Sequence, residues 1–204
     1  MTDLVQHWNQ AFDKPIESLG WYESDPQPTW DLVQTYTEPE HRIHIAGAGR
    51  SVLVSTLWEE GYQNLLLSDL SDQALKLLSK DNPSIPKDYF WQSDLSQAWG
   101  KEHSHKIDTW IDRAVLHFLT QEEQRQVYFK NLKSALKPGG RVILGQFAIE
   151  GAKKCCGLDI FPYDTERYCS YLGSEFDLLE DFDFTYYNPN GDPRPYAYAV
   201  FEKS

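Results

Sequence analysis

The chain has 204 residues, 41% of them hydrophobic, and contains seven Trp, twelve Tyr and ten Phe side chains. This length and composition suit one folded domain with a substantial core and exclude a disordered chain. Its formal net charge is −12, from 31 acidic and 19 basic residues. That balance argues against a nucleic-acid partner, because such partners are held largely by Lys and Arg contacts with phosphates.

No segment is long and apolar enough to span a bilayer, so no membrane partner is expected. The first ten residues, MTDLVQHWNQ, lack the basic flank and apolar centre of a signal peptide. We therefore predict a cytoplasmic protein. The cysteines at positions 155, 156 and 169 have no zinc-ligand spacing, so no metal site is predicted. The oligomeric state stays open.

The first 40 residues form an aromatic lead-in. Helices are predicted over 2–12 and 28–37. We interpret residues 1–40 as a cover over the substrate, within the same domain as residues 41–204. Trp21 and Tyr22 are the candidate covering side chains, although aromatic residues of this kind are more often part of a core.

Strands and helices alternate after residue 40. Apolar stretches predict strands over 42–47, 64–69, 88–94, 106–112 and 141–147. Helices are predicted over 51–60, after Ser71, and from a capping box at Thr120–Glu123 to Leu136. The sequence Lys137-Pro-Gly-Gly140 is expected to break the last helix.

The end of the chain changes character. Two long segments, 176–187 and 195–203, are joined by the turn-rich sequence NPNGDPR and predict a hairpin. Strands that alternate with helices and then end in a hairpin indicate an α/β fold with a mainly parallel sheet and one antiparallel edge element.

In such a sheet, ligands bind beyond the carboxyl ends of the strands. The first strand ends in Gly47-Ala48-Gly49, a turn that lets the backbone approach a ligand closely. Asp69 ends the second strand, where its carboxylate can accept both hydroxyls of a ribose. Asp94 ends the third strand, where it can meet an adenine amino group. These residues together predict a nucleotide site.

The acids also have structural interpretations. Asp69 could cap the following helix, and Asp94 could be an ordinary turn residue. Asp112 and Arg113 end the fourth strand and could form a structural ion pair.

Three kinds of nucleotide site are compatible with a glycine turn. A P-loop is excluded because the chain has no GK[ST] sequence. A dinucleotide site requires a third glycine at the position of Val52, which leaves an NAD-dependent oxidoreductase as a distant alternative. The remaining candidate is S-adenosylmethionine (SAM), whose single adenosine needs only the turn and the ribose acid.

The stretch 108-DTWIDRAVLHFLT-120, followed by LKPGGRVILGQFAIEG and KCCGL, makes a resemblance specific. The chain resembles class I SAM-dependent methyltransferases over nearly its whole length, in particular a group of small bacterial enzymes. This resemblance implies a Rossmann-like, seven-stranded, mostly parallel sheet with an antiparallel last strand and helices on both faces. It also implies that SAM is bound by Gly47, Ala48, Gly49, Asp69, Leu70, Asp94, Leu95, Asp112 and Arg113.

One position departs from the usual pattern of that family. An acid normally precedes the glycine turn and positions the methionine amino group, but this chain has Ile45 there. Similar lysine methyltransferases also lack the acid, so we expect a SAM turn with one contact missing or replaced, weaker by roughly 1–3 kcal/mol. A binding module that kept the fold and lost cofactor activity is the alternative that Ile45 motivates.

The predicted activity is methyl transfer from SAM to a small molecule or, as a second choice, to a protein side chain. This reaction mainly requires alignment, with a base where the acceptor arrives protonated. Asp112 and His117 are the candidate catalytic residues, although His117 could instead be a satisfied packing histidine. Trp21, Tyr22 and Cys155 are the candidate substrate-binding residues.

Overall fold

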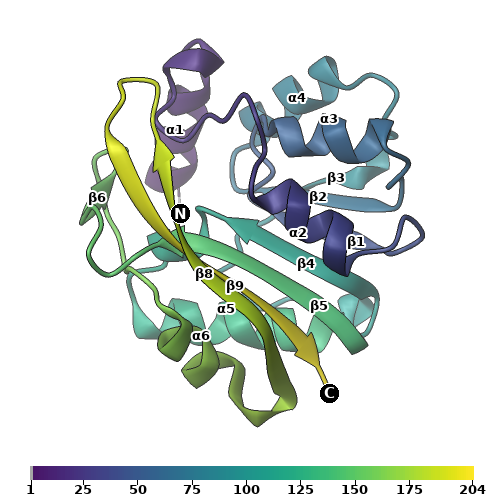
Figure 1. Ribbon diagram of the computed structural model, residues 1–204. Coiled ribbons are helices and arrows are strands. Elements are labelled where there is room, and N and C mark those ends of the chain that lie inside the picture. Colours follow the sequence, from purple (N-terminus) through teal and green to yellow (C-terminus); the bar gives the residue numbers. More distant parts are fainter. Residues whose placement is uncertain (1) are drawn as a thin grey trace.

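The computed structural model describes residues 2–204, and its centre is a seven-stranded sheet with helices on both faces (Figure 1). The strand order is β3-β2-β1-β4-β5-β9-β8. These strands are β1 (Ile43–Ala46), β2 (Leu65–Asp69), β3 (Phe90–Gln92), β4 (Ile107–Arg113), β5 (Leu136–Phe147), β8 (Phe176–Tyr187) and β9 (Pro193–Lys203). A separate short hairpin consists of β6 (Lys154–Cys155) and β7 (Leu158–Asp159).

Two groups of helices bury the two faces of the sheet. The helices are α1 (Thr2–Phe12), α2 (Thr29–Tyr36), α3 (Val52–Glu59), α4 (Asp72–Asp81), α5 (Glu122–Ala135) and α6 (Thr165–Leu172). Apolar side chains of α2, α3 and α4 share one core with the sheet, and those of α5 and α6 share the other. The predicted Rossmann-like architecture is therefore confirmed.

The last strand is antiparallel, as predicted, but it is not at the edge of the sheet. Strand β9 lies between β5 and β8 and pairs antiparallel with both. Six consecutive residues of β9 are buried, whereas most of β8 is exposed. The edge position therefore belongs to β8, because a strand paired on both sides and covered on both faces is the better place for a continuous apolar run.

Two local predictions are corrected. Helix α5 ends at Ala135 as the Pro-Gly-Gly sequence requires, but β5 begins at once at Leu136 instead of after Gly140. Pairing with β4 is irregular there, which accommodates the glycines. The α5 N-cap is Gln121 instead of Thr120, because the Gln124 side chain accepts the Gln121 N–H at 3.2 Å.

Serine caps begin the two helices that follow β1 and β2. Ser51 accepts the Leu53 N–H at 3.2 Å, and Ser71 accepts the Ala74 N–H at 3.0 Å, as predicted for Ser71. Ser71 also donates to Asn9 of α1 at 2.6 Å. This contact ties the lead-in to the carboxyl ends of the strands, where α1 lies in Figure 1. Within residues 2–204, no helix has the length and apolar character needed to cross a membrane.

Candidate active site

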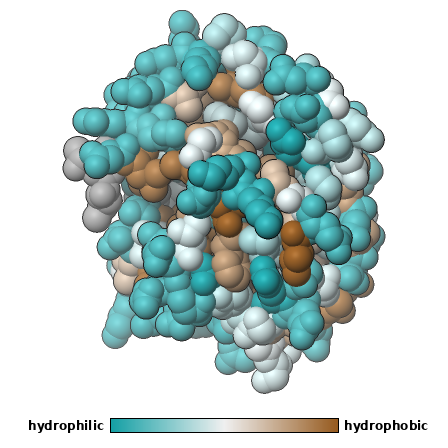
Figure 2. Space-filling model, turned by 90° about the vertical axis from the view of Figure 1, so that its left-hand side faces the viewer, coloured by the Kyte–Doolittle hydropathy of each residue, from teal (hydrophilic) through white to brown (hydrophobic). Residues whose placement is uncertain are grey.

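A partly enclosed cavity of about 350 Å³ lies between the carboxyl ends of the central strands and the lead-in. Its volume is within the range typical of small-molecule sites. All but one of the predicted cofactor residues line it, together with all three predicted substrate residues: Trp21, Tyr22, Gly47, Ala48, Gly49, Asp69, Leu70, Asp94, Leu95, Arg113 and Cys155. The exception is Asp112. Figure 2 looks onto the side of the molecule that carries α1, where apolar surface emerges between polar side chains.

The glycine turn forms one wall of the cavity and has no room for larger residues. Gly47 and Gly49 have φ angles of +66° and +52°, a left-handed conformation that favours glycine. A Cβ atom on Gly47 would lie 2.1 Å from Cγ2 of Val115, and one on Gly49 would lie 3.2 Å from Cζ of Phe12. The segment that follows β4 and helix α1 therefore cover the turn, and the cavity lies along the side of the turn that they leave open.

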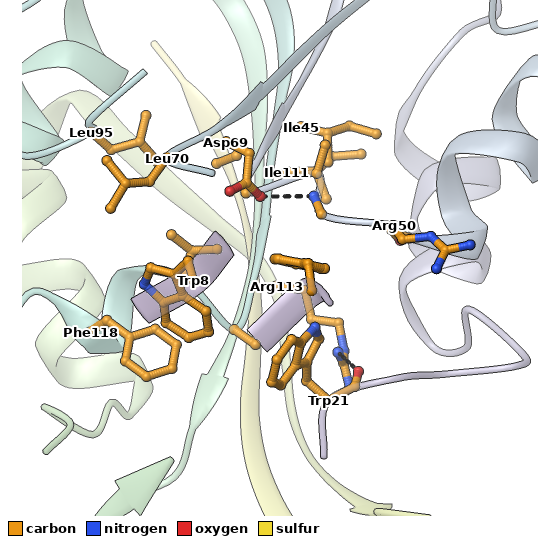
Figure 3. A pocket seen from close by; sticks show the side chains of 18 of the residues that line it. Trp8, Trp21, Ile45, Arg50, Asp69, Leu70, Leu95, Ile111, Arg113 and Phe118 are labelled. Atoms are coloured by element: carbon orange, nitrogen blue, oxygen red, sulfur yellow. Dashed lines mark hydrogen bonds between the residues drawn. The ribbon is translucent and has the colours of Figure 1, made fainter. Parts of the chain in front are cut away.

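Asp69 joins the turn to the start of α4. Its Oδ2 atom accepts the Gly49 N–H at 2.9 Å and its Oδ1 atom accepts the Ser71 N–H at 2.8 Å (Figure 3). Burial raises the pKa of Asp69 to about 6, against the lowering effect of these backbone donors. A carboxylate has about four acceptor positions, so each oxygen can still accept one hydroxyl from a ligand in the cavity.

Asp94, Leu70 and Leu95 line the cavity next to Asp69. Asp94 accepts both the N–H and the hydroxyl of Ser96 through Oδ1, at 2.9 and 2.6 Å, which is the turn geometry that its structural interpretation requires. Among residues 2–204, no side chain or backbone donor reaches its Oδ2 atom within hydrogen-bond distance. Leu70 and Leu95 offer apolar faces close together (Figure 3).

The middle of the cavity is apolar where the usual acid is missing. Ile45 and its neighbour on β4, Ile111, both line it and are almost fully buried. Among the described residues, only three carboxyl side chains line the cavity: Glu23, Asp69 and Asp94. Glu23 comes from the lead-in, so sequence position alone did not connect it with the missing acid.

Glu23 is held by Arg113. Its Oε1 atom lies 2.6 Å from Nη2 of Arg113, and the two side chains are only 11% and 14% exposed. Burial raises the pKa of Glu23 to about 7, although Arg113 acts in the opposite direction. Arg113 also donates to the Trp21 carbonyl at 3.1 Å and lies over the rings of Tyr186 and Tyr196. The predicted ion pair of Arg113 therefore forms with Glu23 and not with Asp112.

Aromatic rings cover the cavity. Trp8 meets Trp21 and Phe118 edge to face, with centroids 5.7 and 4.9 Å apart, and Phe12 meets Trp21 at 5.7 Å. All four line the cavity. Trp8, Phe118 and Trp21 lie near one another, across from Asp69 and Ile45 (Figure 3). Trp21 is thus part of the cover. Trp8 and Phe12 of α1 and Phe118 after β4 were not among the predicted substrate residues, because their contacts join segments far apart in the chain.

Asp112 does not lie on the cavity, which corrects its predicted roles. It is 1% exposed and accepts hydrogen bonds from Tyr128 and Gln146, both at 2.7 Å, and from the Val115 N–H at 3.1 Å. Successive side chains of a strand point to opposite faces, so Ile111 and Arg113 reach the cavity and Asp112 points away. Asp112 instead orders the segment that brings Val115 against Gly47.

His117 is likewise outside the cavity lining. Its ring is fully buried between Phe118 and Phe147, with centroids 4.4 and 4.7 Å away. Neither ring nitrogen has a hydrogen-bond partner among the described residues. His117 is therefore packed among aromatic side chains and does not line the cavity, where its predicted catalytic role would require it. The ring lies close enough to Cys155 to lower the pKa of that thiol.

Residues 45–144 match the family model described as a methyltransferase domain. This segment runs from β1 into β5 and contains the glycine turn, Asp69 and Asp94. The chain therefore carries a class I SAM-dependent methyltransferase domain. The predicted family is confirmed, and SAM is the cofactor that this family uses.

Curated relatives of this methyltransferase domain are larger proteins. An eEF1A lysine and N-terminal methyltransferase homolog of Drosophila melanogaster is 26% identical over 147 residues, which cover 68% of this chain and 21% of that protein. The bovine eEF1A lysine and N-terminal methyltransferase is 25% identical over 142 residues. The chain thus spans about a fifth of the length of these relatives.

Solved structures of similar fold are matched over almost the whole chain. A SAM-dependent methyltransferase from Anabaena variabilis has a TM-score of 0.78 at 15% identity, covering 98% of this chain and 95% of that one. The 1,6-didemethyltoxoflavin-N1-methyltransferase of Burkholderia thailandensis, solved with 1,6-didemethyltoxoflavin and S-adenosylhomocysteine, has a TM-score of 0.70 at 15% identity, covering 100% and 86%. At these identities the likeness concerns the fold.

Proposed function

We propose that this methyltransferase domain transfers the methyl group of SAM to a small, largely apolar molecule. The observation that carries the proposal is the single cavity shared by the glycine turn, Asp69 and the aromatic lead-in. In this proposal residues 41–204 hold the cofactor and residues 1–40 cover the acceptor. The proposal also makes the chain an enzyme, instead of a module that kept only the fold.

The cofactor half of the cavity suits an adenosine. The glycine turn provides close backbone approach, and the free acceptor positions of Asp69 suit the two ribose hydroxyls. Leu70, Leu95 and the free Oδ2 of Asp94 suit the flat apolar faces and the amino group of an adenine. When bound there, SAM supplies a methyl group on an already activated sulfonium.

Glu23 provides the carboxylate that Ile45 lacks. In related enzymes the acid before the glycine turn positions the methionine amino group, and Glu23 is the cavity carboxylate that remains besides Asp69 and Asp94. Arg113 pairs with its Oε1 atom, and a carboxylate has about four acceptor positions, so Glu23 can also accept an ammonium group. In this proposal the carboxylate that binds the methionine amino group comes from the lead-in instead of from β1.

The acceptor half favours a small molecule over a protein. Trp8, Phe12, Trp21 and Phe118 cover the cavity with packed rings, so an acceptor must fit beneath them. Such a chamber excludes water and aligns the reactants, which is the main requirement of methyl transfer. The curated relatives named for eEF1A lysine and N-terminal methylation support a protein acceptor as the second candidate.

Cofactor binding is tested with S-adenosylhomocysteine in isothermal titration. Asp69→Asn should weaken binding about tenfold to 100-fold, because hydrogen bonds to a charged group contribute about 1.5–3 kcal/mol. Asp72→Asn is the matched control, since Asp72 is a nearby carboxylate at the start of α4 that pairs with Lys76 and does not line the cavity. No binding by the wild type at millimolar ligand, or equal losses in the two variants, would refute the proposal.

The acceptor class is tested with methyl-labelled SAM and a cell extract divided by ultrafiltration. We expect the label in the small-molecule fraction. The labelled product should be extracted into organic solvent, because an apolar chamber favours an apolar acceptor. Label confined to the protein fraction would favour the second candidate. Binding of the cofactor with label in neither fraction would instead favour a module without activity.

A further inference from the structure

The β6–β7 hairpin carries two adjacent thiols, and the proposed methyl transfer gives neither of them a chemical step. Cys155 ends β6, and Cys156 follows it in the turn. Their sulfur atoms are 3.5 Å apart, and both residues are half-buried. Cys155 also lines the cavity. Two sulfurs held side by side at the wall of a cavity can act on one ligand together.

The backbone of the hairpin fixes this arrangement. Cys155 pairs with Leu158, so Cys156 and Gly157 are the two central residues of the turn. Both have positive φ angles, +54° and +81°, as in the tight hairpin turn that favours Asn-Gly. A cysteine is costly in that first position, and strain of this kind concentrates at functional sites.

Neighbouring groups favour the thiolate at Cys155. The contact with Cys156 lowers the pKa of Cys155 to about 5, and His117 adds to this effect. His117 is fully buried, and neither ring nitrogen has a hydrogen-bond partner among residues 2–204. The third cysteine, Cys169, is exposed on α6.

The distance between the sulfurs indicates the kind of ligand. Two bonds of about 2.3 Å to a single centre, at an angle between a right angle and the tetrahedral angle, separate the sulfurs by about 3.3–3.8 Å. The observed 3.5 Å lies within that interval, whereas a disulfide requires about 2.0 Å. No cluster of three or more metal-ligating side chains exists in the described chain, which disfavours ions that need several protein ligands.

We propose that Cys155 and Cys156 form a chelating site for one trivalent, thiophilic metalloid centre, with an organic arsine oxide as the probe. Two arsenic–sulfur bonds form, the arsenic–oxygen bonds break, and the oxygen leaves as water with both thiol protons. Arsenic stays trivalent, so the step requires no oxidant or reductant. This site is independent of methyl transfer, because the binding requires no cofactor.

The test is titration of the full-length protein with phenylarsine oxide under reducing conditions, followed by intact-protein mass spectrometry. One phenylarsenic group should bind, remain in the presence of excess monothiol and leave with a dithiol. Cys156→Asn removes one sulfur with a residue that the turn favours, and Cys155→Ser removes the other. Both should weaken binding by about 100-fold or more, since the chelate is lost.

Cys169→Ala is the matched control and should bind like the wild type. Thermal unfolding of each variant establishes that it is folded, and Cys156→Asn should be at least as stable as the wild type. Three results would each overturn the proposal: retention of the arsenical by Cys156→Asn, loss of it in Cys169→Ala, or release from the wild type by monothiol alone.

Discussion

Replacing Gly47 with alanine perturbs the turn in two separable ways. The φ angle of +66° makes any L side chain strained there, at a cost of about 1–2 kcal/mol. The new Cβ would also lie 2.1 Å from Cγ2 of Val115, far inside the 3.5–4.0 Å optimum for two carbons. Overpacking of this kind costs about 1–3 kcal/mol, so Gly47→Ala should lower the free energy of unfolding by about 2–5 kcal/mol.

Two further variants separate these costs. Gly139 has a similar φ of +74° with no atom within 4 Å of a built Cβ, so Gly139→Ala measures conformational strain alone. Val115→Ala removes both γ-carbons and leaves the Val115 Cβ at 3.3 Å as the nearest atom. In the Val115→Ala background, Gly47→Ala should lower the free energy of unfolding by no more than Gly139→Ala lowers it in the wild type.

Urea unfolding without ligand gives the four free energies of this cycle, and titration with S-adenosylhomocysteine gives the accompanying affinities. Affinity should fall in Gly47→Ala and recover in the double variant. The reasoning would be refuted if Gly47→Ala and Gly139→Ala cost the same, or if the cost at Gly47 were unchanged without the Val115 γ-carbons.

Other outcomes follow from the charges of Glu23, His44 and Asp112. Because a protonated Glu23 does not attract an ammonium group and burial raises its pKa to about 7, SAM affinity should fall about tenfold per pH unit below pH 7. Glu23→Gln should bind weakly at every pH, and titration of a wild type without this slope would contradict the role. Burial lowers the pKa of His44 to about 3, below its unfolded value near 6.5, so its contribution to stability is complete above pH 6.5 and is lost as the pH falls. When the pH falls from 7 to 5, the free energy of unfolding measured in urea should drop by about 2 kcal/mol less for His44→Phe than for the wild type. Equal drops in the two proteins would exclude the effect. Tyr128→Phe removes a buried donor to Asp112 and should cost about 1–3 kcal/mol in the free energy of unfolding, whereas an unchanged value would show that Asp112 does not depend on it.

The predicted site residues that line the cavity are placed there by local chemistry. Gly47, Gly49 and Asp69 line the cavity because a strand followed at once by a helix needs a tight turn, and both neighbouring strands end at the same edge of the sheet. Ser71 capped α4 for an equally local reason, since its hydroxyl reaches a free N–H of the first helical turn. These features need no distant partner.

Asp112 shows an error that the sequence already contained the means to avoid. Arg113 and Asp112 are adjacent on one strand, so their side chains cannot both face the cavity. The resemblance to the family implied that both residues bind the cofactor. Because side chains alternate along a strand, Arg113 faces the cavity and Asp112 faces away from it, where it contacts Tyr128 and Gln146.

The sequence by itself determined the order of strands and helices, the bend at the glycines and the acid of the second strand, because each depends on residues a few positions apart. Only the tertiary structure decided that Glu23 lines the same cavity as Ile45, that α1 covers Gly49, and that β9 lies inside the sheet. Those contacts join segments far apart in the chain. Their free energy comes from burial and charge pairing that exist only once the whole sheet has formed, so no local pattern encodes them.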